Sequence, residues 1–292
     1  MCGIVGKAMR QGADLALSDE KVAQAIGAIN HRGPDSCGTY SNGNMWLGHV
    51  RLSIIDLSGA ANQPMVTEDK RFVISFNGEV YNFRDLASSL SLVALRSHSD
   101  TEVVLEAFAE FGVEIFSQLN GMFAFAIYDK HAQKLWLVRD RLGIKPLYYS
   151  IDSQGLVFGS EIKAISVLTE TPPVCEISAL HEWLFYGNTL GEHTLYQGVR
   201  KLLPGHYLEL DLIAFTHETV EYWSPVKQAT LPQIKGSQDD LAKGVEHLLE
   251  QAVKRQLVSD VPVGIFLSGG IDSSAITAFA AKHYCGRIAT YS

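Results

Sequence analysis

Short runs rich in β-branched and aromatic residues recur through the first two thirds of the chain, with turn residues between most of them. The predicted strands are Met45–Ile55, Phe72–Phe76, Phe123–Tyr128, Lys134–Val138, Leu147–Ser150, Leu156–Phe158 and His206–Leu210. Apolar residues at helical spacing predict two helices in the same part of the chain, Glu20–Asn30 and Thr101–Phe111. Strands and helices mixed in this order predict layered sheets with helices outside them.

A different pattern follows the segment Ser224–Gln238, which contains two prolines and little periodicity. We therefore expect a first domain over residues 2–213, a linker over 214–238 and the start of a second domain over 239–292. The predicted elements of the second domain are a helix, a strand, a helix and a strand, at Asp239–Leu257, Val263–Leu267, Ser273–His283 and Arg287–Tyr291. This order is typical of a doubly wound parallel sheet, which needs further strands. We expect a piece of a longer protein, the alternative being a small appendage on the first domain.

The composition restricts the class of protein. The chain has 292 residues, which is long for one domain, and its 47% hydrophobic and 19% charged residues exclude a disordered or fibrous protein. Its 32 acidic and 24 basic residues give a net charge of -8, which argues against a nucleic-acid-binding protein. No apolar run could span a membrane, the start lacks a secretory signal, and the four cysteines show no metal-ligand spacing. We therefore expect a soluble, cytoplasmic protein with reduced cysteines.

The position of Cys2 suggests a nucleophile. A side chain this small normally allows removal of Met1, which would leave the cysteine as the N-terminal residue. The α-amine of that residue, with an ordinary pKa of about 7.7–8.0, could then act as the general base for its own thiol. The alternative is a small apolar residue at the start of a strand.

Three further sites allow both a structural and a functional interpretation. Asn77-Gly78 is typical of a tight hairpin turn, but a side-chain amide beside a backbone N–H also suits an oxyanion hole. Arg51, in an apolar segment, would either face solvent or hold a carboxylate in a bidentate manner. Asp100, in the first turn of a helix, would either favour the helix dipole or receive a substrate ammonium group.

Three loops combine charged, polar and turn-forming residues. His31–Asp35 and Arg139–Pro146 have the composition of solvated loops with local ion pairs. Ser268–Ser274 lies between a predicted strand and a helix, where serine hydroxyls, backbone N–H groups and the helix dipole favour a phosphate. No Gly-Lys-Ser/Thr follows, so this is not a Walker motif.

Together these residues resemble the glutamine-hydrolysing asparagine synthetases of the B type, over essentially the whole chain. The matching motifs are Met1–Gly6, His31–Asp35, Arg51–Asp56, Asn77–Asn82, Ser99–Glu102, Gly121–Phe125, Arg139–Tyr148 and Ser259–Ser274. The resemblance implies a class II glutamine amidotransferase, which is an α+β N-terminal-nucleophile hydrolase with a four-layer αββα sandwich. The opening unit of an α/β ATP-pyrophosphatase domain, of the adenine nucleotide α hydrolase type, would follow it.

The resemblance also implies roles for particular residues. Cys2 would attack the side-chain amide of glutamine to form a thioester, with Asn77 and Gly78 as the oxyanion hole. Arg51 would hold the α-carboxylate of glutamine. The full set implied to bind glutamine is Arg51, Leu52, Ser53, Ile54, Glu79 and Asp100, the last two on the α-amino group. The set implied to bind ATP, with Mg²⁺ nearby, is Leu267, Ser268, Gly269, Gly270, Asp272 and Ser273.

The reaction implied for the complete enzyme begins with hydrolysis of glutamine to glutamate and ammonia. The ammonia would pass through an internal channel to an ATP-activated aspartate, giving asparagine, AMP and pyrophosphate. The present chain lacks the region that binds aspartate in this family, so we expect it to act at most as a glutaminase. Glutamine, ATP and aspartate are the implied partners, with no nucleic acid or membrane, and enzymes of this kind are often homodimers.

Two other functions fit the same motifs. An asparagine-synthetase-like amidotransferase could use a different acceptor, as in surface-glycan or secondary-metabolite synthesis, because its donor half would look the same. A non-catalytic partner that binds glutamine or nucleotide is the alternative from another class, although the complete set of site residues argues against it. Amino-sugar and purine amidotransferases lack the Ser268–Ser274 turn, and β-lactam-forming relatives lack the N-terminal nucleophile.

Overall fold

A computed structural model describes residues 2–91, 94–169 and 172–292 of the chain. Met1 lies outside the described residues, so its removal stays a prediction. The chain divides into two compact units, and we describe each by itself. The first comprises Met1–Ser53 and Ser58–Ser224, and the second comprises Ile54–Leu57 and Pro225–Ser292. Within the described ranges, no helix has both the length and the apolar character needed to cross a membrane.

Two six-stranded sheets form the centre of the first unit. In order across the first sheet, the strands are β10 (Val199–Lys201), β8 (Tyr148–Ile151), β9 (Gly155–Gly159), β1 (Gly3–Met9), β3 (Met45–Arg51) and β2 (Ser36–Asn42). In order across the second sheet, they are β12 (Thr216–Glu221), β11 (His206–Asp211), β7 (Lys134–Arg139), β6 (Gly121–Asp129), β5 (Phe72–Val80) and β4 (Met65–Val66). Neighbouring strands are antiparallel throughout both sheets.

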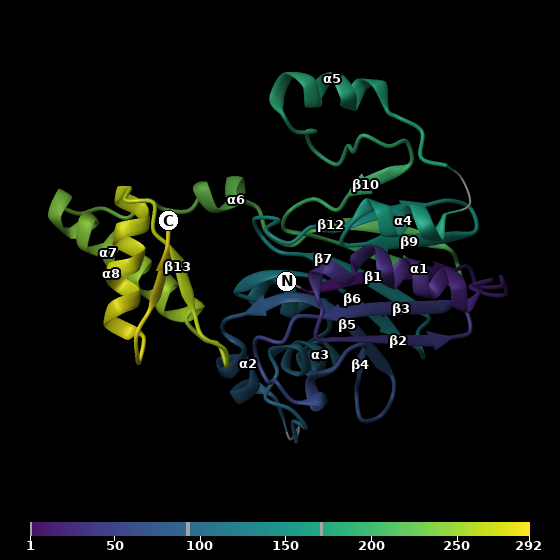
Figure 1. Cartoon of the computed structure of the whole chain (residues 1–292), viewed down its shortest axis with the longest axis horizontal. Coiled ribbons are helices and arrows are strands. Elements are labelled where there is room, and N and C mark those ends of the chain that lie inside the picture. The colour runs from purple at the N-terminus through teal and green to yellow at the C-terminus, as the bar shows by residue number, and fades with distance from the viewer. Residues whose placement is uncertain (1, 92–93, 170–171) are drawn as a thin grey trace. The chain divides into compact units, whose positions relative to one another are not determined.

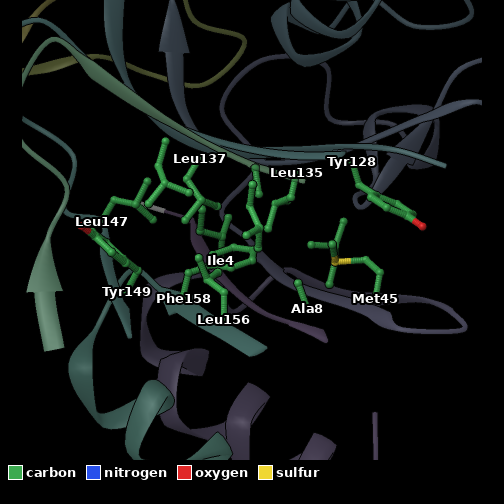
Figure 2. Packing of buried hydrophobic residues seen from close by; sticks show 14 of the residues in the cluster. Ile4, Ala8, Met45, Tyr128, Leu135, Leu137, Leu147, Tyr149, Leu156 and Phe158 are labelled. Atoms are coloured by element: carbon green, nitrogen blue, oxygen red, sulfur yellow. The ribbon is translucent and has the colours of Figure 1, made fainter. Parts of the chain in front are cut away.

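The two sheets pack face to face through a core of apolar side chains (Figure 2). Ile4 and Phe158 face this core from the first sheet, and Tyr128 and Leu137 face it from the second. Because side chains alternate along a strand, Val5 points to the opposite face of the first sheet, where helices cover it. Each large apolar side chain buried in this way stabilises the fold by about 1.5–3 kcal/mol.

Helices cover both outer faces of these sheets (Figure 1). The helices of the first unit are α1 (Asp19–Ile29), α2 (Phe83–Ser89), α3 (Asp100–Phe111), α4 (Ile162–Leu168) and α5 (Ile177–Tyr186). α1 and α4 pack on the first sheet. α3 packs on the second, where the Phe108 ring lies 4.9 Å from the Trp136 ring and 5.5 Å from the Phe72 ring. The layers therefore form the αββα sandwich of an N-terminal-nucleophile hydrolase, which confirms the predicted fold.

Two expectations about strands are wrong. Asn77-Gly78 is not a hairpin turn, because both residues lie inside the nine-residue strand β5 and pair with Ala124 and Phe123 of β6. The segment 214–238 is not entirely a linker, because β12 lies within it and pairs with β11. Most residues of β12 are polar and exposed, so the apolar alternation that usually indicates a strand is missing.

The second unit contains a short parallel sheet and three helices among its described residues. Its elements are α6 (Pro225–Ala229), α7 (Gln238–Gln256), β13 (Gly264–Phe266), α8 (Ile271–His283) and β14 (Ala289–Tyr291). β13 and β14 are parallel, as their strand, helix, strand order predicts. A capping box of Ser237 and Asp240 begins α7, and His283 of α8 lies 2.9 Å from Glu250 of α7. The unit thus has the opening arrangement of a doubly wound sheet.

Candidate active site

Cys2 lies immediately before β1 with its sulfur held against the backbone of Leu52. The Leu52 N–H donates to the Sγ atom at 3.3 Å, and Sγ lies 3.5 Å from the Leu52 carbonyl oxygen. Burial raises the pKa of the Cys2 thiol, while the Leu52 N–H and the positive charge of Arg51 oppose this rise. The thiol therefore needs a base or nearby positive charge to ionise at neutral pH.

Arg32 and Asp35 come from the charged loop His31–Asp35 and fix the backbone on both sides of this sulfur contact. Arg32 Nε donates to the Cys2 carbonyl oxygen at 3.0 Å, and its Nη1 atom pairs with Glu161 at 2.9 Å. The Asp35 carboxylate accepts the Ser53 N–H at 2.7 Å. The segment is largely exposed and forms ion pairs with Glu161, as the solvated-loop interpretation predicts, but its charges also hold the nucleophile and the following loop in place.

Asn77 lies in β5 with its side chain 1% exposed. Among the described residues, neither its Oδ1 nor its Nδ2 atom has a hydrogen-bond partner. An amide left unpaired in a protein interior costs about 1–3 kcal/mol, so a ligand that bonds to it would remove that penalty. His49 of β3 lies 3.0 Å from the carbonyl oxygen of Phe76, which ties the two sheets together next to this amide.

The residues two positions before and two positions after Gly78 both donate backbone hydrogen bonds to side chains. The Phe76 N–H donates to Gln63 Oε1 at 2.7 Å, and the Val80 N–H donates to the Asp100 carboxylate at 2.9 Å. Because every second residue of a strand directs its N–H to the same edge, the Gly78 N–H lies at this edge between them. β5 thus presents a backbone N–H directly beside a buried side-chain amide.

Asp100 and Glu79 place two acidic groups near each other. Burial raises the pKa of Asp100 to about 7, and the charge of Glu79 adds to this rise against the Val80 N–H bond. Burial also raises the pKa of Glu79, while the positive charge of Lys145 opposes the change. A bound cation would lower both pKa values, so this arrangement favours an ammonium group.

Arg51 does not face solvent, because it is 5% exposed at the end of β3. Its Nη1 atom donates to the Ser58 carbonyl oxygen at 2.9 Å and to Asn62 Oδ1 at 3.0 Å. Oxygen atoms of two uncharged groups therefore hold the guanidinium in position. A buried guanidinium held in a fixed position is suited to a carboxylate ligand.

The segment that follows Arg51 is divided between the two units. Leu52 and Ser53 belong to the first unit, where their N–H groups bond to the Cys2 sulfur and to Asp35. Ile54 belongs to the second unit, where its carbonyl oxygen accepts the Asp260 N–H at 2.9 Å. Leu52 and Ser53 thus lie beside Cys2 and Asp35 within the first unit, and a role of Ile54 in binding glutamine stays a prediction.

Lys145 is a residue near this site that the sequence did not indicate. It is 3% exposed, and the charges that act on it include those of Glu79 and Cys2. The loop that carries it folds around the buried carboxylate of Asp140, which also bonds to Phe123 of β6. This shape depends on a contact between distant segments, so local composition indicates only a charged loop.

The Ser268–Ser274 turn joins β13 to α8, as the sequence predicts. Gly269 has a φ of +80°, and Ser268 Oγ lies 3.1 Å from Ser273 Oγ. Gly270 precedes α8 and has no side chain to cap it, so the first N–H groups of this 13-residue helix remain available to a ligand. The turn therefore fits a phosphate group. In the part of the chain that the structure describes, no group of three or more His, Cys, Asp or Glu is arranged to hold a metal ion.

Two family models match the chain in succession. The model described as a glutamine amidotransferase domain matches residues 1–223, and the model described as asparagine synthase matches residues 244–292. Asparagine synthetase [glutamine-hydrolyzing] 2 from Bacillus subtilis is 38% identical over 263 residues, which cover 87% of this chain and 35% of that protein. Asparagine synthetase [glutamine-hydrolyzing] 3 from the same organism is 36% identical over 292 residues, which cover 97% of this chain and 46% of that protein. The chain thus spans less than half the length of either relative.

Two other matches extend the comparison. Amidase chyE from Penicillium rubens is 37% identical over 269 residues, which cover 90% of this chain and 38% of that protein. The solved glutamine phosphoribosylpyrophosphate amidotransferase from Bacillus subtilis, complexed with ADP and GMP, matches 99% of this chain and 65% of its own, with a TM-score of 0.54. At 16% identity, this structural match supports the fold alone. Because the first family model covers most of the sequence, the chain belongs to the glutamine amidotransferase domain family, as a relative of the glutamine-hydrolysing asparagine synthetases.

Proposed function

We propose that the chain hydrolyses glutamine to glutamate and ammonia at Cys2, as the donor part of a longer glutamine-dependent asparagine synthetase. The observation that carries this proposal is the buried Asn77 amide, which has no partner for either polar atom among the described residues. With the neighbouring Gly78 N–H, it suits the oxyanion that forms when a thiolate attacks an amide carbonyl.

The proposed reaction starts once Met1 has been removed. The α-amine of Cys2 takes the thiol proton, and Sγ attacks the side-chain amide carbon of glutamine. Collapse of the tetrahedral intermediate breaks the C–N bond while the α-ammonium group of Cys2 returns its proton to the leaving nitrogen. Ammonia is released, and a thioester is left on the sulfur. Water then attacks the thioester, which yields glutamate and restores the thiol. Arg32 keeps the backbone of the nucleophile fixed through these steps by its bond to the Cys2 carbonyl oxygen.

The same site offers one positive and two negative groups for the ends of an amino acid. Arg51 is proposed to hold the α-carboxylate of glutamine, because its guanidinium is buried and its Nη1 atom is held by the Ser58 carbonyl oxygen and by Asn62. Asp100 and Glu79 are proposed to receive the α-ammonium group, which would favour their ionised forms. Leu52 and Ser53 would line the pocket beside the sulfur.

The second unit is proposed to begin the domain that binds ATP with Mg²⁺. Ser268, Gly269, Gly270, Asp272 and Ser273 would hold the phosphates, with Leu267 next to the nucleotide; the match to asparagine synthase over residues 244–292 supports this. In the longer protein, bound ATP supplies the activation of an aspartate carboxylate that ammonia then converts to asparagine, AMP and pyrophosphate. A reducing compartment that contains ATP, such as the cytoplasm, suits both this chemistry and the Cys2 thiol. We also infer a homodimer, by analogy with enzymes of this kind.

A second candidate function differs only in the acceptor. The similarity to Amidase chyE, at 37% identity, is compatible with a longer protein that delivers ammonia to a carboxylate other than aspartate. The proposed hydrolysis of glutamine is the same in both cases, and assays of the longer protein with aspartate and ATP separate them.

Release of glutamate from glutamine by the purified chain tests the hydrolysis, after mass spectrometry has shown that Met1 is absent. Cys2→Ala should abolish the release, whereas Cys175→Ala, at an exposed cysteine, should leave it unchanged. Equal release by wild type and Cys2→Ala would show that another group performs the reaction. Glutamine binding without any release would show a binding protein instead.

A further inference from the structure

The pairing of β1 with its neighbouring strands begins only after the nucleophile. β1 pairs with β3 from Gly3 onwards and with β9 from Val5 onwards. Cys2 precedes both of these pairings, so the ladders of the sheet do not hold its carbonyl oxygen. That oxygen instead accepts a hydrogen bond from a side chain, the Nε atom of Arg32, at 3.0 Å.

Ser160, the residue after β9, attaches the start of β1 by another means. It is 0% exposed, and it bonds to Ile4 in both directions. The Ser160 N–H donates to the Ile4 carbonyl oxygen at 2.9 Å, and the Ile4 N–H donates to Ser160 Oγ at 3.0 Å. These two bonds fix the backbone of Ser160 against β1, so the next residue, Glu161, begins at a fixed place close to the nucleophile.

From that place, the Glu161 carboxylate reaches the arginine that holds Cys2. Glu161 Oε1 lies 2.9 Å from Arg32 Nη1. The other terminal nitrogen of the guanidinium, Nη2, is buried and has no hydrogen-bond partner among the described residues. The Cys2 carbonyl oxygen and Glu161 are therefore the two groups that orient the guanidinium through hydrogen bonds.

These contacts close a ring that runs from the nucleophile through Arg32 and Glu161 and returns along β1. Gly3 lies on the β1 side of this ring. A Cβ at Gly3 would lie 3.2 Å from Arg32 Cδ and 3.0 Å from Val50 Cγ2, so the stem of the arginine packs directly against this backbone. The ring is short and closely packed, which makes the position of the nucleophile depend on that of the guanidinium.

Glu161 is a charged partner for Arg32 at neutral pH. Burial raises the pKa of Glu161, but hydrogen bonds from Arg32, Lys163 and His31 together lower it below its ordinary value. Lys163 Nζ lies 3.1 Å from Oε2, and His31 Nε2 lies 2.8 Å from Oε1. A carboxylate accepts a stronger hydrogen bond from a guanidinium than a neutral oxygen does. The charge of Glu161 therefore strengthens its hold on the arginine.

We propose that Glu161 is a positioning residue of the glutamine-hydrolysing site: its carboxylate orients Arg32, which holds the Cys2 backbone so that the sulfur stays against the Leu52 N–H. This inference rests on the proposed function, since it concerns the nucleophile of that reaction. The side-chain partners of Glu161 lie outside the set proposed to bind glutamine. Its loss should therefore lower kcat and leave KM nearly unchanged.

The test uses Glu161→Gln in the full 292-residue chain, after mass spectrometry has shown that Met1 is absent. Glutamine has nearly the size of glutamate but no charge, so the contact with Arg32 is weakened while the packing remains. We expect kcat for glutamine hydrolysis to fall about tenfold and KM to change less than about twofold. Glu192→Gln is the matched control, because Glu192 makes the same kind of ion pair with Arg200, at 3.0 Å, in the same unit. The control should leave kcat unchanged.

A double-mutant cycle shows whether Glu161 acts through the arginine. In the Arg32→Met background, Glu161→Gln should lower kcat by less than about a further twofold. An unchanged kcat in Glu161→Gln, or an equal fall in Glu192→Gln, would overturn the proposal. A fall that is undiminished in the Arg32→Met background, or a rise in KM in place of a fall in kcat, would overturn it as well.

Hydrogen exchange at the Leu52 amide, measured by NMR, gives a second readout that needs no turnover. This N–H donates to Cys2 Sγ at 3.3 Å, so it reports whether the sulfur keeps its position. The amide should exchange about tenfold faster in Glu161→Gln than in the wild type or Glu192→Gln. Equal exchange in all three would overturn the role of Glu161. If the wild type releases no glutamate, the proposed hydrolysis is wrong, and exchange at Leu52 still decides whether Glu161 positions Cys2.

Discussion

Arg32 joins the nucleophile to the start of α4, since its Nε atom lies 3.0 Å from the Cys2 carbonyl oxygen while its Nη1 atom lies 2.9 Å from Glu161, the residue before that helix. A lysine keeps the charge but cannot make both contacts from one planar group. For Arg32→Lys, we therefore expect kcat for glutamine hydrolysis to fall by about 10- to 100-fold, as the loss of one charged hydrogen bond predicts, with a smaller change in KM. Steady-state kinetics check this, with Arg10→Lys, just beyond the other end of β1, as the control. An unchanged kcat would show that the contact does not position the sulfur.

Binding of glutamine should strengthen as pH rises, because of Asp100. Its pKa of about 7 in the free protein means that the carboxyl group is largely protonated at pH 6 and largely ionised at pH 8. Only the ionised form attracts the α-ammonium group of glutamine. Calorimetry on Cys2→Ala, which prevents turnover, should show a Kd that falls from pH 6 to pH 8. In the Cys2→Ala, Asp100→Asn protein the Kd should be higher and lose most of this dependence; an identical dependence in both would assign it to another group.

Asp100→Asn should also stabilise the fold at alkaline pH. The pKa of this acid is about 7 in the folded protein and about 3.9 in an unfolded chain, so the unfolded state ionises first. The stability that the protonated form provides is therefore present at low pH and lost as pH rises through 7. Asparagine never ionises and keeps an oxygen to accept the Val80 N–H. In urea unfolding, the variant should exceed the wild type at pH 8 by an amount on the order of a few kcal/mol, and by less at pH 5. A difference that does not vary with pH would contradict this explanation.

Two glycines should respond in opposite ways to the same substitution. A Cβ at Gly78 would lie 2.2 Å from the Met122 carbonyl oxygen and 2.6 Å from the Phe123 Cα, both of which belong to the paired strand β6. Gly78→Ala should therefore destabilise the protein by about 3 kcal/mol or more. At Gly27 of α1, a Cβ would meet nothing within 4 Å, so Gly27→Ala should stabilise the protein by about 0.5–1 kcal/mol. Urea midpoints measure both, and a tolerated Gly78→Ala would show that β6 can move away.

The sequence predicts those parts of the fold and site that short segments encode. Apolar runs predict strands such as Phe123–Tyr128, and apolar residues at helical spacing predict the helix Thr101–Phe111, which in the structure begins one residue earlier, at Asp100. The motifs around Cys2 and Arg51 predict a nucleophile and a carboxylate-binding group, because each of these groups lies within its own short motif. The structure adds that Arg51 is buried, which decides against its solvent-facing interpretation.

Features that depend on distant pairing could not be predicted in this way. Asn77-Gly78 has the composition of a turn, and only its pairing with β6 makes it part of a strand. β12 is a polar edge strand that forms on β11, so its own residues show no apolar alternation. Lys145 lies in a loop whose shape depends on the backbone of Phe123, 22 positions earlier in the numbering of the chain.

In the loop around Asp140, the side chain that determines the backbone shape is different from the side chains that face solvent. The Asp140 carboxylate accepts the backbone N–H groups of Leu142 and Ile144. The side chains of these two residues are 69% and 55% exposed and do not contribute to these hydrogen bonds. Substitutions at those two positions can therefore change the surface without moving the backbone. The surface that this loop presents can thus vary on an unchanged backbone framework.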